Sequence, residues 1–73
     1  MGYIDVSNGP DEARLIGSGV HVWALVGYAR AMSGDLARVA LDYGLTEAEV
    51  RAALAYYQQN PQAIDAKLAS HAA

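Results

Sequence analysis

The spacing of hydrophobic residues becomes helical near residue 22 and stays so to the end of the chain. Apolar residues then recur every three or four positions, the period of a helix that buries one face. Three such stretches predict helices over residues 22–32, 34–43 and 47–59. Their apolar stripes are Val22, Leu25, Val26, Ala29 and Met32; Leu36, Val39, Ala40 and Tyr43; and Val50, Ala53, Leu54 and Tyr57.

Residues that favour helix ends lie between these stripes. Ser33 is a good N-cap for the second helix, and Gly44 suits the position just after its last turn. Thr46 and Glu49 have the spacing of a capping box at the start of the third helix. Asn60 and Pro61 supply an N-cap and a first-turn proline for a fourth helix over residues 61–71, with a narrow apolar seam of Ile64 and Leu68.

The first 21 residues have a different pattern. Short β-type runs over 3–6, 14–16 and 20–22 alternate with a dense turn signal over 7–11 and with the glycine-rich segment 17–19. Strands of three or four residues are not stable alone, so this ribbon needs the helices, or a second chain, to pack against.

These patterns predict a mostly α single domain over residues 1–73. A helix-turn-helix bundle of three helices (22–59) follows the β ribbon (1–21), and a C-terminal helix (60–73) completes it.

Composition narrows the possible functions. The chain has no cysteine, and its two histidines show no metal-ligand spacing, so we expect neither a disulfide nor a metal or other cofactor. Arg30 ends the longest apolar run before it reaches the ~18 residues of a membrane span, and the N-terminus lacks the order of a signal peptide. We therefore expect a cytoplasmic protein without a membrane partner.

Candidate catalytic groups are sparse. Ser18 and His21 lie close in the sequence, but no nucleophile elbow or oxyanion-hole pattern surrounds them. Glu47 and Glu49 are two positions apart on a predicted helix, about 200° around its axis, so they do not converge on one ligand. We therefore expect that Ser18 is a turn serine, that His21 is a histidine at a strand edge, and that the protein is not an enzyme.

Few residues are suited to DNA. The net charge is −3, and Arg38 and Arg51 are the only basic residues on the predicted helix-turn-helix. Two phosphate contacts per chain are a weak basis for affinity, because binding grows with the number of phosphates neutralised. DNA contact through these arginines is expected to be auxiliary at most, unless a second copy or a basic partner adds charge.

Some large side chains lie outside the apolar stripes. Trp23 and Arg30 share one side of the first predicted helix with Gly27, and Tyr56 lies beside the stripe of the third. Tryptophan and arginine are over-represented at interface hot spots, so Trp23, Arg30 and Tyr56 predict the interface of a homodimer. The short N-terminal ribbon also supports a homodimer, because its edge is open to pairing with its twin. The alternative is a half-buried tryptophan covered by the ribbon, with Tyr56 covering the fourth helix.

The ordered set of these segments resembles a widespread group of small bacterial proteins similar to VapB-type antitoxins. That group typically reads G-T-R-I-P-V, a helix, G-M-S, D-Y-x-x-L-T, I-R-A-A-L-A-Y-Y and H-P-E-E-I-D-A. The matching segments here are 17–22, 31–33, 42–46, 50–57 and 60–66, within a resemblance that spans roughly residues 13–68. The chain differs at Ser18, Gly19 and His21, where the group has Thr, Arg and Pro.

The resemblance implies a homeodomain-like tri-helical fold and a function as an antitoxin that neutralises a PIN-like ribonuclease toxin. Such a toxin has an acidic cleft, and an amphipathic helix with a cation suits it. Ile64, Lys67 and Leu68 on the fourth helix are therefore the predicted toxin-binding residues. The fourth helix folding back on its own domain is the alternative for these residues, and a small transcriptional regulator is the alternative function.

Overall fold

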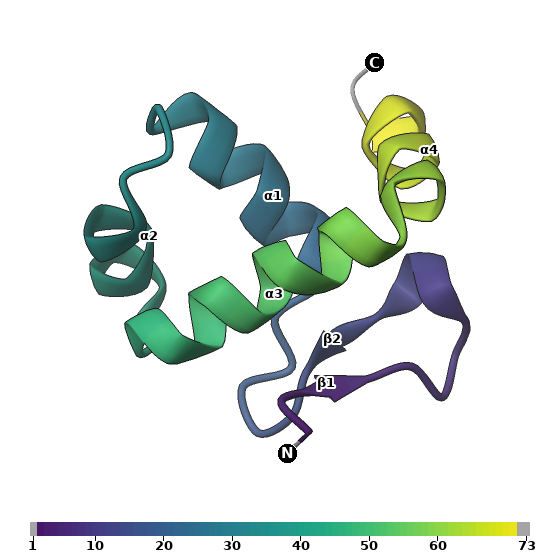
Figure 1. The fold of residues 1–73 in the computed structure, drawn as a ribbon, viewed down its shortest axis with the longest axis horizontal. Helices are drawn as coiled ribbons and strands as arrows, with labels where there is room; N and C mark the ends of the chain where they lie inside the picture. The colour runs from purple at the N-terminus through teal and green to yellow at the C-terminus, as the bar shows by residue number, and fades with distance from the viewer. Residues whose placement is uncertain (1, 72–73) are drawn as a thin grey trace.

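The computed structural model describes residues 2–71, and it is mostly helical with a short antiparallel ribbon, as predicted (Figure 1). Its elements in chain order are β1 (Ile4–Asp5), the 3-10 helix η1 (Pro10–Glu12), β2 (Arg14–Leu15), α1 (Val22–Ala31), α2 (Leu36–Tyr43), α3 (Glu47–Gln59) and α4 (Pro61–His71). In Figure 1, α3 crosses the middle of the molecule, with α2 near one of its ends and α4 near the other. Helix α1 packs against α2, α3 and α4, and the ribbon lies beside α3.

The predicted apolar stripes form the core. The α1 stripe is buried except for Met32, which lies just past the helix and is partly buried. The stripes of α2 and α3 contribute two buried residues each, and their remaining members pack around the core. The buried core residues are Ala13, Leu15, Val22, Leu25, Val26, Ala29, Val39, Ala40, Val50, Ala53 and Ile64.

The turn between α2 and α3 has the predicted geometry. Gly44 ends α2 in the left-handed region at φ 66°, which costs glycine little because it has no Cβ. Thr46 Oγ1 accepts a hydrogen bond from the Glu49 N–H at 3.1 Å, and Glu49 Oε1 accepts one from the Thr46 N–H at 2.9 Å. These two hydrogen bonds confirm the capping box. The geometry of the turn therefore follows from local residues, namely Gly44, Thr46 and Glu49.

The prediction that Ser33 caps α2 is wrong. Ser33 has φ 57° and Gly34 has φ 79°, and their N–H groups donate to the carbonyls of Arg30 and Ala29. Both residues therefore close α1, and α2 begins only at Leu36. Its N-cap is Asp35, whose carboxylate accepts from the Arg38 N–H at 3.1 Å.

Pro61 begins α4 as predicted, but the Asn60 side chain contacts the preceding helix. Its amide donates to the Tyr56 carbonyl at 3.2 Å, which satisfies an acceptor at the end of α3. Asn60 is thus the single residue between the two helices.

The ribbon is shorter than predicted. Ile4 pairs with Leu15 and Asp5 with Arg14, while the third predicted segment (20–22) contributes only an isolated bridge between His21 and Arg14. Val22 already belongs to α1, so the chain leaves the ribbon there.

Removal of the capping hydroxyl provides a test of the α2–α3 turn. Thr46→Ala is expected to lower the free energy of unfolding by about 1 kcal/mol, because the Glu49 N–H loses its acceptor. Thr46→Ser keeps the hydroxyl and is expected to retain most of that stability. Urea denaturation followed by circular dichroism measures both variants, and equal losses for the two would contradict the role of the cap.

Candidate functional site

Helix α4 packs on its own domain, as in the alternative left open by the sequence. Ile64 is fully buried, and Leu68 packs into a notch at Gly27, where an added Cβ would lie 3.1 Å from Leu68 Cδ2. Lys67 forms an ion pair with Glu12 of η1. The predicted toxin-binding residues Ile64, Lys67 and Leu68 therefore make contacts within the chain. Ile64 is not accessible to a partner while α4 stays in place.

A polar cluster of Arg30, Tyr57 and Asp65 joins α4 to α1 and α3. An Arg30 Nη donates to the Tyr57 hydroxyl at 2.6 Å and to Asp65 Oδ1 at 3.2 Å, and the Tyr57 hydroxyl donates to Asp65 at 2.8 Å. The hydrogen bond to Asp65 raises the pKa of Tyr57. Arg30 thus has partners from two other helices, although its side chain remains half exposed.

A second polar contact, between Lys67 and Glu12, holds the other side of α4 against η1. The hydrogen bond from Lys67 holds the pKa of Glu12 below that of a free glutamate, and the same contact raises the pKa of Lys67. The other Glu12 carboxylate oxygen lies 3.7 Å from His21 Nε2. Glu12 therefore links η1 to α4 and to the start of α1.

The predicted dimer-interface residues also have partners within the chain. Trp23 stacks on His71 of α4, with ring centroids 4.3 Å apart and planes 7° apart, and its buried Nε1 has no hydrogen-bond partner in the described chain. The Tyr56 hydroxyl donates to the Pro10 carbonyl at 2.9 Å. Trp23 is covered by His71 of α4 and also lies near His21 at the end of the ribbon, with ring centroids 5.9 Å apart, while the Tyr56 hydroxyl reaches η1. With Arg30 in the polar cluster, each of the three predicted interface residues has a partner within the chain.

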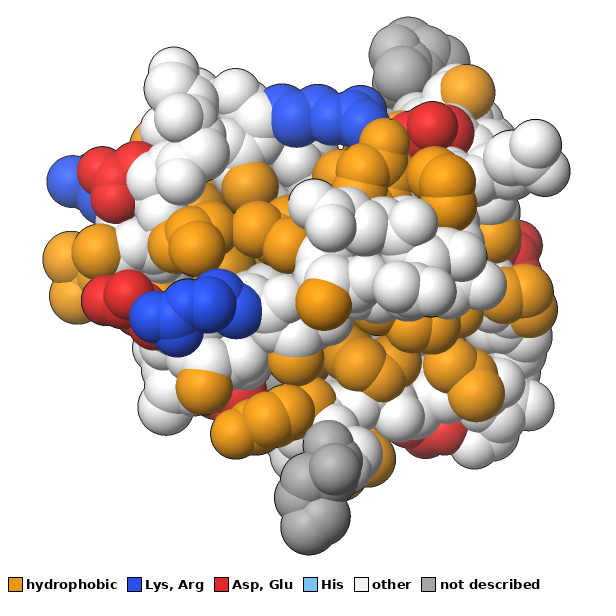
Figure 2. Space-filling model, in the orientation of Figure 1, with side chains coloured by type: hydrophobic (Ala, Val, Ile, Leu, Met, Phe, Trp, Pro, Cys, Tyr) orange, Lys and Arg blue, Asp and Glu red, His pale blue; other side chains and the backbone are white. Residues whose placement is uncertain are grey.

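Two apolar clefts remain open on either side of α1. One, the α1–α3 cleft, has a volume of about 330 Å³ and is lined by Val26, Ala29, Arg30, Ser33, Gly34, Leu54 and Tyr57. The other, the aromatic cleft, has a volume of about 340 Å³ and is lined by Trp23, Ala24, Gly27, Tyr28, Ala31, Tyr43 and Leu68. Figure 2 shows hydrophobic side chains gathered across the middle of the face it views.

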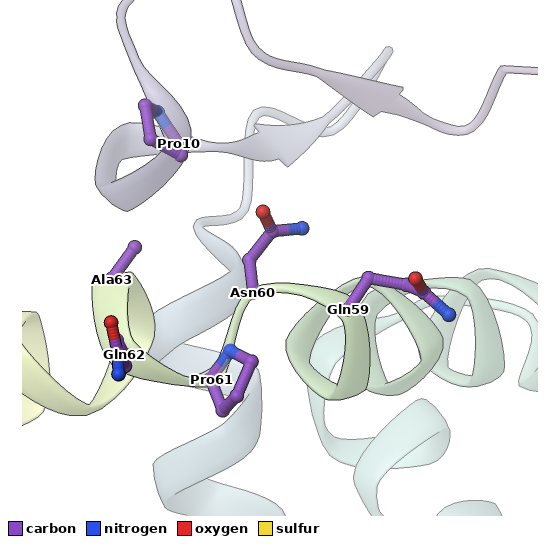
Figure 3. Close-up of a pocket in the computed structure, with 6 residues that line it drawn as sticks. All are labelled: Pro10, Gln59, Asn60, Pro61, Gln62 and Ala63. Carbon is purple, nitrogen blue, oxygen red and sulfur yellow. The ribbon is translucent and has the colours of Figure 1, made fainter.

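A third and larger pocket lies at the corner between η1, α3 and α4. Its volume is about 410 Å³, and its lining residues are Pro10, Gln59, Asn60, Pro61, Gln62 and Ala63. In Figure 3 the side-chain amides of Gln59, Asn60 and Gln62 point in different directions and do not converge on one point. None of the lining residues has an ionisable side chain, so this pocket offers no group for acid–base chemistry.

Every basic side chain lies close to a carboxylate. The ion pairs are Arg30–Asp65 at 3.2 Å, Arg38–Asp42 at 3.0 Å, Arg51–Glu47 at 3.3 Å and Lys67–Glu12, and Arg14 lies across the ribbon from Asp5. On the face in Figure 2, basic groups are seen beside acidic ones. The predicted DNA-contacting residues Arg38 and Arg51 are exposed, but each is paired within its own helix.

Groups for catalysis or metal binding do not gather elsewhere in residues 2–71. No group of three or more His, Cys, Asp or Glu side chains there could hold a metal ion. The Ser18 hydroxyl accepts from the Val20 N–H at 3.3 Å and acts within its turn. No helix in this range has the length and apolar character to cross a membrane.

Comparison of the chain with known protein families, with curated proteins and with solved structures gives no match. The candidate site is therefore defined by geometry alone. The α1–α3 cleft is the strongest candidate, because it is apolar, open and bordered by an exposed arginine.

The sequence did not indicate this cleft. Leu54 belongs to a buried stripe by its spacing, but in the structure its side chain is only partly buried and lines the cleft. The sequence did not indicate the role of Glu12 either. One of its partners is His21, and the other, Lys67, lies 55 residues further along the chain. The spacing of Gly27 four residues after Trp23 was visible, but its use as a notch for Leu68 was not.

Acid should weaken the contact between η1 and α4. Because the folded-state pKa of Glu12 is lowered, its carboxylate stabilises the fold above the pKa of the unfolded chain, and this contribution is lost as the pH falls through the folded value. Urea titrations from pH 7 to pH 3 should therefore show a smaller loss of stability in Glu12→Gln than in the wild type. Glu47→Gln, which removes an exposed carboxylate on α3, is the matched control and should follow the wild type. Identical acid profiles for wild type and Glu12→Gln would contradict the role of Glu12.

Proposed function

We propose that this chain is a protein-binding module of the antitoxin type, which neutralises a PIN-like ribonuclease toxin. In this proposal a homeodomain-like tri-helical unit binds the toxin through the α1–α3 cleft. The observation that carries the proposal is an open apolar cleft of about 330 Å³ with Arg30 on its border. Clefts of this kind accept the apolar face of a helix, and arginine is common among residues that dominate binding.

The charge distribution supports a protein partner over DNA. Each of the five basic residues lies near a carboxylate of the same chain, and the net charge is −3. A cation that is already paired must give up that partner to neutralise a phosphate, so it gains less from DNA. An apolar cleft has no such competing partner.

The cleft is also a better candidate than α4 as the toxin-binding element. Exposing Ile64 would require α4 to leave the domain, and losing a fully buried isoleucine from a core costs about 2–5 kcal/mol. Leu54 can contact a partner without any rearrangement of the helices. Arg30 is 56% exposed at the border of the cleft, but it would have to exchange or share its pairing with Asp65 to meet a carboxylate of the toxin.

Truncation of Leu54 tests the cleft. Leu54→Ala is expected to weaken binding to a PIN-like ribonuclease encoded beside this chain by about 30-fold, because well-buried interface residues contribute on the order of 2 kcal/mol. Leu41→Ala is the matched control, since Leu41 is 74% exposed on α2 and does not line the cleft. Calorimetric titration and inhibition of RNA cleavage measure the effect. Equal affinities for the two variants would refute this binding site.

A small transcriptional regulator remains the second proposal, because α2 and α3 are joined by the short turn 44–46 and carry the exposed Arg38 and Arg51. Its test is the salt dependence of binding to the DNA upstream of the gene. The paired cations predict a shallow slope, equivalent to about two phosphate contacts per chain or fewer. A steep slope that falls in the double variant Arg38→Ala, Arg51→Ala would favour the regulator over the antitoxin.

A further inference from the structure

The outer edge of β1 carries backbone groups without a partner in residues 2–71. The Ile16 N–H donates to the Tyr3 carbonyl at 2.9 Å, so Tyr3 and Ile16 form a hydrogen-bonded pair of the ladder. Hydrogen-bonded and non-hydrogen-bonded pairs alternate in antiparallel strands. The next pair, Ile4 and Leu15, is therefore non-hydrogen-bonded, and the N–H and C=O of Ile4 point away from β2.

The hydrogen bonds of Leu15 support this assignment. Its N–H donates to the Val20 carbonyl at 2.8 Å, and its C=O accepts from the Gly19 N–H at 3.0 Å, both on the side away from β1. Figure 1 shows β1 at the margin of the molecule, with β2 on its inner side. The groups of Ile4 thus face outward from the ribbon.

Exposed hydrophobic side chains are concentrated around this edge. Four large hydrophobic residues are exposed in the described chain, and three of them, Tyr3, Val6 and Ile16, lie on or beside the ribbon. Segment 2–6 also lacks lysine and proline, which commonly protect an edge strand from pairing. Pairing with another strand would satisfy the free backbone groups of this edge and cover the exposed hydrophobic side chains beside it.

We propose that β1 pairs with β1 of a second copy of this chain, so that two ribbons form a symmetric four-stranded sheet with the twofold axis at Ile4. This dimer is independent of the proposed toxin binding. It replaces the interface predicted from Trp23, Arg30 and Tyr56, whose side chains have partners within the chain.

The alternation of backbone groups allows only a few registers. Outward-facing residues must pair with outward-facing residues, which puts the twofold axis at a residue rather than between two residues. Within segment 2–6, only an axis at Tyr3, Ile4 or Asp5 gives more than one such pair. An axis at Asp5 would place two carboxylates directly opposite each other, which is destabilising. An axis at Tyr3 leaves Val6 without a partner in segment 2–6.

The axis at Ile4 satisfies both conditions. It pairs Ile4 with Ile4 of the second copy through backbone groups that have no partner in residues 2–71. It also places Gly2 opposite Val6, whose carbonyl already accepts from the Gly9 N–H at 3.0 Å and would have to accept a second hydrogen bond. Asp5 then lies opposite Tyr3 of the second copy, twice in each dimer. Val6 lies diagonal to Ile4 of the second copy, which would cover a side chain that is 50% exposed in the single chain.

A pair of substitutions at Tyr3 tests the dimer and its register. Tyr3→Lys and Tyr3→Glu remove the same ring but place opposite charges against Asp5 of the second copy. Sedimentation equilibrium of the wild type at high micromolar concentration should give twice the chain mass of 7.7 kDa. Tyr3→Glu should dimerise at least about tenfold more weakly than Tyr3→Lys, with the difference shrinking in high salt, because two cross-strand charge pairs change sign.

The alternatives predict different results. An axis at Tyr3 would weaken both variants alike, and an axis at Asp5 would leave them equal, since residue 3 would then face Ser7. Either result overturns the proposed register, and a wild type that is monomeric throughout overturns the dimer.

A backbone modification tests the hydrogen bonds without changing a side chain. Chemical synthesis of the full chain with an N-methyl group on Ile4 removes an N–H that the ribbon itself does not use. This variant should keep the helical circular dichroism of the unmodified synthetic chain and lose at least tenfold in dimer affinity. A methylated chain that folds and dimerises as tightly as the unmodified one contradicts pairing through β1.

Discussion

The packing of α1 against α3 is the interaction on which the rest of the structure depends. Helix α1 contributes four residues to the core, and α3 adds Val50 and Ala53. A chain of this size buries only about 60% of its unfolded surface, so few other residues can replace these contacts. The ribbon, α2 and α4 are each too short to be stable alone, and each packs against this pair.

Helix α4 illustrates how a short element is held when few apolar residues are available. Ile64 is its only fully buried side chain, and its other contacts include the notch at Gly27, the Trp23–His71 stack, the Arg30 cluster and the Lys67–Glu12 pair. Ion pairs at a protein surface contribute little each, so the apolar contacts of Ile64, Leu68 and the Trp23–His71 stack provide most of the stabilisation. Polar contacts on both sides of α4 fix its orientation on α1.

Ion pairs within the chain also determine the charge of its surface. With each basic side chain near a carboxylate, residues 2–71 form no strongly positive face, and the surfaces that they leave for partners include apolar clefts and a strand edge. Recognition by such surfaces depends on shape and on backbone hydrogen bonds more than on long-range charge.

The sequence by itself determined the local structure. Helical spacing, Gly44, the Thr46–Glu49 capping box and Pro61 predicted four helices and most of their ends, because these signals act within a few residues. Only the tertiary structure decided how the helix faces are used. Trp23, Tyr56 and Lys67 looked like partner-binding residues, yet they contact His71, Pro10 and Glu12, which lie 46 to 55 residues away. The α1–α3 cleft likewise depends on how two helices pack against each other. Which backbone groups of β1 face outward depends on which residues form the hydrogen-bonded pairs with β2. Periodicity shows which side of an element is apolar, but it does not show which distant segment will cover that side.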